Sequence, residues 1–285
     1  MNSFGGVENQ CRVSVIMLTM NRAQYIEPAI VSVRNQTFQD WELIIVQDGS
    51  DERVRNAVNP WLVKEARIRY FHRSEVGNIA NGTNFAIARA KGRFIAILDD
   101  DDAWIHPDKL AMQVAMMVRD EDVVCVGGGA LVVDVYGNEV MRYLKPAQDC
   151  DCRRRALLTN PLIHSTALYR KSSADSFGLY DDTLNAFADY DFCLKLMRCG
   201  RLINLPEYFV SYRVWDEGSS SRYGMSIAWS NFKIINRHFL SFRYYPIALL
   251  VGAAHLFLAL FPRKVRARLY QFLSKKKKKI FSATN

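Results

Sequence analysis

Short runs of apolar residues alternate with segments in which apolar side chains recur every three or four positions. Four runs rich in Val and Ile are typical of buried strands, and they cover residues 13–18, 42–46, 68–71 and 94–98. After the first run, Ile26, Ile30 and Val33 have the spacing of one helix face, and a second helical segment runs from Ile79 to Ala90. This alternation predicts β-α-β units and a mostly parallel sheet.

The pattern becomes mixed in the second half of the chain. It predicts helices at 109–118 and 190–199, with strands at 123–126, 130–135, 202–205 and 209–214. Residues 143–176 have no regular period. No internal repeat is visible.

Two of the predicted strands end in carboxylates. The strand at 42–46 leads into Asp48, and the strand at 94–98 leads into the four consecutive carboxylates Asp99–Asp102. Ligands of open α/β sheets bind outside the carboxyl ends of the strands, so we expect both groups at one site. Adjacent carboxylates raise one another's pKa and favour a bound cation, and oxygen ligands suit Mg²⁺ or Mn²⁺. A solvated acidic loop is the alternative interpretation.

Several segments, taken in order, resemble the motifs of a known family. Val13–Arg22, Gln47–Ser50 and Gly92–Trp104, followed by Pro107 and Leu110, resemble the successive motifs of family 2 glycosyltransferases. The resemblance covers about residues 12–217. It implies a GT-A fold, which is an α/β Rossmann-like, mostly parallel sheet flanked by helices. It also implies inverting, metal-dependent transfer from a nucleotide-diphosphate sugar.

The resemblance assigns donor contacts to four residues. Thr19 and Asn21 would line the nucleotide pocket, and Asp48 would hydrogen-bond the base. Asn78 stands where the family often offers a further nucleotide contact.

The acidic cluster resembles the family's D-x-D metal motif. Asp101 would ligate Mn²⁺ or Mg²⁺, and Asp99 would contact the ribose or the metal shell. Asp100 would also face the donor. Asp100 and Asp102 form a second D-x-D pair that overlaps the first, so the register of the motif stays open. The cation would bridge the donor phosphates and stabilise the leaving diphosphate.

Inverting transfer also needs a base for the acceptor hydroxyl. Ala188–Phe192 resembles the family's Glu-Asp segment at a helix start, and Asp189 takes the position of the base. Ala188 replaces the usual Glu, and Asp191 remains an alternative base. A helix cap is the alternative role for Asp189.

Two further positions concern the metal shell and the acceptor side of the family pattern. Trp215 follows Tyr212 and Arg213 where many relatives have a metal-proximal His, so that ligand stays unassigned, with Asp216, Glu217 or water as alternatives. His164 lies in the region expected to face the acceptor, although a structural role is the alternative.

Composition and charge divide the chain. The residues are 49% hydrophobic and 24% charged, which excludes a largely disordered protein. The net charge is +9, yet no acidic residue follows Glu217, while thirteen Lys and Arg do. We therefore predict a catalytic domain at 1–221 and a basic helical tail at 222–285.

The tail has the features of a membrane-associating segment. Its uncharged stretch at 247–261 is shorter than the ~20 residues of a transmembrane helix. One helical face then carries Val265, Leu269, Phe272 and Leu273, and lysines 275–279 follow. This predicts attachment to an anionic membrane surface, with a hairpin packed on the catalytic domain as the alternative. Without a secretory signal, we expect a cytoplasmic protein, peripheral on the inner face of the membrane.

The sequence thus predicts a hexosyltransferase that moves a sugar, expected from a UDP-sugar, to a saccharide acceptor. A lipid-linked saccharide is the expected acceptor, in cell-surface polysaccharide synthesis, because a soluble one would leave the tail without a purpose. One alternative is a sugar nucleotidyltransferase, although Thr19–Arg22 lacks the glycine-rich loop of that class. The other is a non-catalytic membrane or nucleic-acid adaptor. We expect no nucleic-acid partner.

Overall fold

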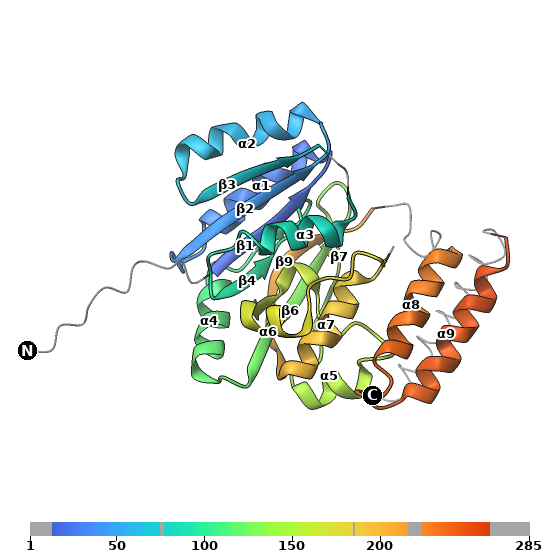
Figure 1. The fold of residues 1–285 in the computed structure, drawn as a ribbon. Coiled ribbons are helices and arrows are strands. Elements are labelled where there is room, and N and C mark those ends of the chain that lie inside the picture. The colour runs from blue at the N-terminus through green and yellow to red at the C-terminus, as the bar shows by residue number, and fades with distance from the viewer. Residues whose placement is uncertain (1–12, 75–76, 185, 216–223, 263–285) are drawn as a thin grey trace, which may run out of the picture.

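The computed structural model describes residues 13–74, 77–184, 186–215 and 224–262. Within these residues nine strands form one sheet, in the order β3-β2-β1-β4-β8-β6-β9-β5, with β7 paired to β6 (Figure 1). The strands are β1 (Val13–Thr19), β2 (Trp41–Asp48), β3 (Ile68–Arg73), β4 (Phe94–Ile97), β5 (Ala103–Trp104), β6 (Val123–Val133), β7 (Glu139–Tyr143), β8 (Leu168–Arg170) and β9 (Arg201–Arg213).

The N-terminal half of the sheet is parallel. Val13 of β1 lies opposite Trp41 of β2 and Phe94 of β4, and β2 continues in parallel to β3. β8 pairs antiparallel with β4 and β6, whereas β6 and β9 are parallel. The parallel arrangement places the carboxyl ends of β1, β2 and β4 on one edge.

Helices cover both faces of this sheet. They are α1 (Ala23–Arg34), α2 (Glu52–Lys64), α3 (Ile79–Ile87), α4 (Lys109–Arg119), α5 (Asp149–Arg155), α6 (Lys171–Phe177), α7 (Ala188–Cys199), α8 (Met225–Arg237) and α9 (Tyr245–Ala259), with a 3-10 turn η1 at His164–Thr166. Val15 of β1 shares a buried cluster with Ile30 of α1. Ile16, the next residue, shares a second cluster with Ala86 of α3 and Leu194 of α7. Because successive strand residues face opposite sides, the sheet has two apolar cores.

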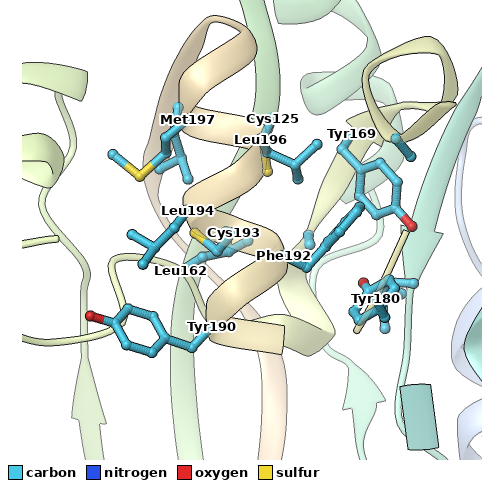
Figure 2. Packing of buried hydrophobic residues seen from close by; sticks show 14 of the residues in the cluster. Cys125, Leu162, Tyr169, Tyr180, Tyr190, Phe192, Cys193, Leu194, Leu196 and Met197 are labelled. Carbon is cyan, nitrogen blue, oxygen red and sulfur yellow. The ribbon is translucent and has the colours of Figure 1, made fainter. Parts of the chain in front are cut away.

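α7 is the central helix of the second core. Phe192 stacks on Tyr180 with ring centroids 4.1 Å apart and meets Tyr169 edge-on at 5.0 Å (Figure 2). Leu194 and Leu196 of the same helix are also fully or almost fully buried. These contacts anchor the helix whose first turn carries Asp189.

The predicted α/β fold and its four N-terminal strands are confirmed. Two later predictions were wrong, because 123–126 with 130–135, and 202–205 with 209–214, are each one continuous strand, β6 and β9. The glycines between the first pair allow close packing: a Cβ on Gly128 would lie 2.3 Å from the ring of Phe209. Helix α2 was not predicted, although Val54, Val58 and Trp61 are its buried residues.

The first part of the predicted tail is a helical hairpin, α8 and α9, packed beside α7 (Figure 1). Ile234 and Ile235 of α8 and Ala248 of α9 belong to the same core cluster as Leu194. The packed-hairpin interpretation therefore holds for 225–259, and these residues do not form a separate core. The face at 265–273 and lysines 275–279 lie outside the described residues. In the described part of the chain, every helix is too short or too polar to cross a membrane.

Candidate active site

A cavity of about 740 Å³ opens at the carboxyl ends of the parallel strands. The predicted site residues that line it are Thr19, Asn21, Asp48, Asn78, Asp99, Asp100, Asp101, His164 and Asp189. They come from β1, β2, the turn after β4, and the starts of α3, η1 and α7. The fold thus joins segments that are up to 170 positions apart in the chain.

Asp48 and Asn78 both line the cavity. Asp48 ends β2 with only 1% of its surface exposed, and its Oδ1 lies 3.3 Å from Nη1 of Arg73. Burial raises the pKa of Asp48, and the charge of Arg73 offsets only part of that shift. The Asn78 side chain caps α3, because its Oδ1 accepts a hydrogen bond from the Asn81 amide at 2.9 Å.

The acidic turn after β4 divides its carboxylates between the cavity and the interior. Asp102 does not line the cavity: it accepts hydrogen bonds from Ser165 at 2.6 Å and from the Arg213 amide at 2.9 Å. Asp99, Asp100 and Asp101 all line it. Asp100 and Asp102 therefore do not both face a ligand in the cavity, as the second D-x-D pair would require.

A guanidinium lies between two of these carboxylates. Arg22 Nη1 is 3.0 Å from Asp100 Oδ1 and 2.8 Å from Asp101 Oδ2. Trp215 also donates its indole N–H to Asp101 Oδ2 at 3.0 Å, with Arg22 over its ring. Burial, with the charges of Asp101 and Asp99, raises the pKa of Asp100 to about 6, although Arg22 lowers it.

This donor set fits a hard divalent cation. Carboxylate oxygens are the ligands that Mg²⁺ and Mn²⁺ prefer, and Asp100 and Asp101 already bind a cationic group. Among the described residues, no three His, Cys, Asp or Glu side chains gather closely enough to hold a metal by themselves. With only the described residues available, donor phosphate and water oxygens would complete the shell. Trp215 supplies none, and Asp216 and Glu217 lie outside the described residues.

Asp189, in the first turn of α7, also lines the cavity. Its Oδ2 accepts a hydrogen bond from Asn160 Nδ2 at 3.2 Å. The N-cap residue of α7 is Phe187, so Asp189 is not the capping residue of this helix. Asp191, the alternative base, has no exposed surface and does not line the cavity; its carboxylate pairs with Lys195 and Arg237 instead.

His164 lies between the two acidic regions. Its Nδ1 is 3.7 Å from Asp99 Oδ1, and its Nε2 is 3.0 Å from the Tyr180 hydroxyl. Burial lowers the pKa of His164, but the nearby carboxylate of Asp99 raises it more, with a smaller upward contribution from Asp189. The net shift is upward and favours the charged imidazolium.

Several polar cavity residues were not predicted from the sequence, among them Arg22, Asn160, Tyr180 and Trp215 in its role beside Asp101. Arg22 directly follows the expected contact Asn21, so its position in the first motif was an available signal. Asn160 belongs to the stretch without a period, where the sequence offered none.

Comparison with known proteins agrees with this arrangement. Residues 14–178 match the family described as glycosyl transferase family 2. An uncharacterized glycosyltransferase of Rickettsia felis is 27% identical over 77% of this chain, and one of Rickettsia typhi is 29% identical over 72%. The chain spans only 38% and 64% of those two proteins. A β-1,3-glucosyltransferase of Escherichia coli is 38% identical over 38% of this chain and 42% of its own length.

Solved structures share the fold. A mannosyltransferase of Pyrobaculum calidifontis, in complex with GDP-Man and Mn²⁺, has a TM-score of 0.64 at 20% identity and covers 92% of this chain and 80% of its own. Staphylococcus aureus TarS with UDP-GlcNAc has a TM-score of 0.62 at 18% identity, over 86% and 72% of the two chains. With a family match over more than half its length and the fold of the GT-A neighbours, the chain belongs to glycosyl transferase family 2.

Proposed function

We propose that this enzyme transfers a sugar, with inversion, from a nucleotide-diphosphate sugar to a saccharide acceptor, and that it uses Mn²⁺ or Mg²⁺. The observation that supports the proposal most is that Asp101, after β4, and Asp189, in α7, line the same cavity. A metal carboxylate and a base on one cavity are the two groups that such a displacement needs.

The donor would bind along the strand edge, with its nucleobase near Asp48 and its diphosphate near the acidic turn after β4. A divalent cation held by Asp101, with Asp99 beside it, would neutralise the diphosphate and stabilise it as the leaving group. Arg22, now bound to Asp100 and Asp101, would have to turn away from that position. A donor phosphate is then the nearest anion for its guanidinium.

The acceptor would enter on the side of Asp189. Its hydroxyl would lose a proton to the Asp189 carboxylate as the oxygen attacks the anomeric carbon, opposite the departing diphosphate. Asn160 holds Oδ2 of Asp189 at 3.2 Å and would orient the other oxygen toward that hydroxyl. His164, between Asp99 and Tyr180, is our candidate for a contact with acceptor or sugar hydroxyls.

Relatives support a UDP-sugar and a lipid-linked acceptor. The Escherichia coli relative is named for UDP-Glc and for GlcNAc linked to diphosphoundecaprenol. Chondroitin synthase of Pasteurella multocida is 27% identical over 68% of this chain, although the chain spans only 20% of it. Together they favour a role in cell-surface polysaccharide synthesis.

A lipid-linked acceptor agrees with a peripheral position on the inner face of the membrane. α9 has no charged side chain, and Leu250, Phe257 and Leu260 on and after it are 61% to 72% exposed. We propose that this surface and the basic residues after it contact an anionic membrane from the cytoplasm. Nucleic acid is not part of the proposal.

The test uses the full chain, Mn²⁺, UDP-sugars and an undecaprenyl-diphosphate-linked sugar as acceptor. The expected product carries the opposite anomeric configuration from the donor, read by NMR from the coupling of the anomeric proton. A retained configuration would contradict the inverting assignment. Release of pyrophosphate from a sugar phosphate and UTP would instead support the sugar nucleotidyltransferase.

A further inference from the structure

The first turn of α7 begins from an unusual backbone conformation. Phe187, the residue before the helix, has φ 63° and ψ 25°, the left-handed region that bulky L-residues rarely occupy. Such a conformation costs free energy and persists only where surrounding contacts hold it. Asp189 follows two residues later, so this turn sets the direction in which its carboxylate enters the cavity.

Asp191 is the anchor beside that turn. Its backbone N–H donates to the Phe187 carbonyl at 3.0 Å, and its side chain is fully buried. Three cationic or polar side chains hold the carboxylate: Arg237 Nη1 at 3.0 Å from each oxygen, His238 Nε2 at 3.0 Å and Lys195 Nζ at 3.1 Å. Burial alone would raise the pKa of Asp191, but these partners lower it, so the carboxylate is charged.

Arg237 also holds the loop on the other side of Phe187. Its Nη2 lies 2.6 Å from Asp181 Oδ2, while Asp181 Oδ1 accepts hydrogen bonds from the N–H and hydroxyl of Thr183. One guanidinium, at the end of α8, therefore binds the chain both before and after the left-handed residue. Only Lys195 among these partners belongs to α7 itself.

We propose that Arg237 and His238 are positioning residues for the base: they clamp Asp191 and thereby fix the orientation of Asp189 in the cavity. This inference rests on the proposed role of Asp189. It gives the α8–α9 hairpin a catalytic purpose beyond surface contact, because the hairpin supplies the clamp. Movement of α8 away from α7 would release the first turn of α7 and misdirect the base.

The experiment compares Arg237→Gln, Arg237→Lys and His238→Gln in the full chain. Arg243→Gln is the matched control, because Arg243 is an exposed arginine of the same hairpin. Small displacements of a catalytic group are costly, so we expect Arg237→Gln to lower kcat by about 10- to 100-fold. The Kd of the nucleotide diphosphate with Mn²⁺ should change less than about twofold, since Arg237 touches no donor-side residue. Arg237→Lys should recover part of kcat, and Arg243→Gln should resemble the native chain.

A second comparison separates positioning from folding. If Arg237 acts through Asp189, then Arg237→Gln should lower kcat no further in an Asp189→Asn background. Equal losses in both backgrounds, or a parallel fall of kcat and donor affinity, would overturn the proposal.

A structural readout keeps the inference apart from the proposed function. Amide hydrogen exchange at 188–191 should accelerate in Arg237→Gln relative to 194–199, whether or not an acceptor has been found. Uniform or absent acceleration would overturn the clamp. Selective acceleration without any effect of Asp189→Asn on kcat would contradict the role of Asp189 instead.

Discussion

Arg22 Nη1 lies 2.8 Å from Asp101 Oδ2, and the same nitrogen lies 3.0 Å from Asp100 Oδ1. The arginine therefore supplies the counter-charge that consecutive carboxylates at a buried strand end require. On the proposed function, a metal ligated by Asp101 would have to compete with this guanidinium. The competition would make binding of metal and donor together more favourable than binding of metal alone, since a diphosphate would offer Arg22 a new partner.

Arg22→Gln should strengthen the binding of Mn²⁺ alone at pH 8, because the competing charge is gone. A unit charge at about 4 Å in water-like surroundings repels a divalent cation by ~2 kcal/mol, which corresponds to roughly 30-fold in Kd. Isothermal titration of Mn²⁺ without nucleotide measures the change. Arg154→Gln, at an exposed arginine on α5, is the control. Equal Mn²⁺ affinities in both variants would show that Arg22 does not occupy the metal position.

Asp189→Asn should lower turnover by roughly 10²-fold or more while the donor Kd stays near the native value, because the base is lost and the shape is kept. Steady-state kinetics with a competent acceptor measure it, with the exposed Asp175→Asn as control. Asp191→Asn should instead lower the melting temperature, since it leaves Arg237 and Lys195 without their buried partner. A stable Asp191→Asn that is less active than Asp189→Asn would show that the base is misassigned.

The pKa of Asp100 predicts how the stability of the metal-free protein depends on pH. Its value of about 6 in the folded chain is above the 3.8 of an unperturbed carboxyl, so the folded state binds the extra proton between those values. Protonation of Asp100 therefore contributes fully to the free energy of unfolding below about pH 4, and this contribution is lost as pH rises through about 6. Thermal unfolding in EDTA should show this loss, and Asp100→Asn should reduce the slope. An unchanged slope would contradict the assignment of the shift to Asp100.

Removal of residues 263–285 should weaken binding to anionic vesicles without unfolding the enzyme. Each basic side chain near such a surface contributes ~1 kcal/mol, so the full chain should bind best at low salt. A cut after Ser221 is unsuitable, because it would remove Ile234 and Ile235 from the core. Replacement of lysines 275–279 by Gln should give intermediate, less salt-sensitive sedimentation. Undiminished binding by the chain ending at Pro262 would exclude attachment through these residues.

Three strands were predictable from the sequence because they are buried almost throughout. β1, β2 and β4 are buried along nearly all their length, so each appears as an unbroken apolar run that leads into a polar turn. The positions of Asp48 and Asp99 at one edge followed from this. β6 was divided in the prediction because three glycines interrupt its apolar run, whereas in the fold they bring it close to Phe209 of β9.

The contacts that tune the site could not be predicted, because they join distant parts of the chain. Arg22 meets Asp101 across 79 positions, and Arg237 meets Asp191 across 46. Neither pair has a periodic pattern to reveal it. By sequence, Asp189 was the expected base and Asp191 the alternative; in the fold, Asp191 is fully buried on the α8 side, whereas Asp189 lines the cavity.

The most direct test of metal-dependent sugar transfer is release of nucleotide diphosphate from a panel of nucleotide-diphosphate sugars by the full chain, with Mn²⁺ or with EDTA. We expect release from at least one UDP-sugar, and only with the divalent cation. We also expect Asp101→Ala to lose that release at an unchanged melting temperature, with Asp151→Ala, at a half-exposed side chain, as the active control. Equal release in EDTA, or undiminished release by Asp101→Ala, would contradict metal-dependent sugar transfer at this cavity.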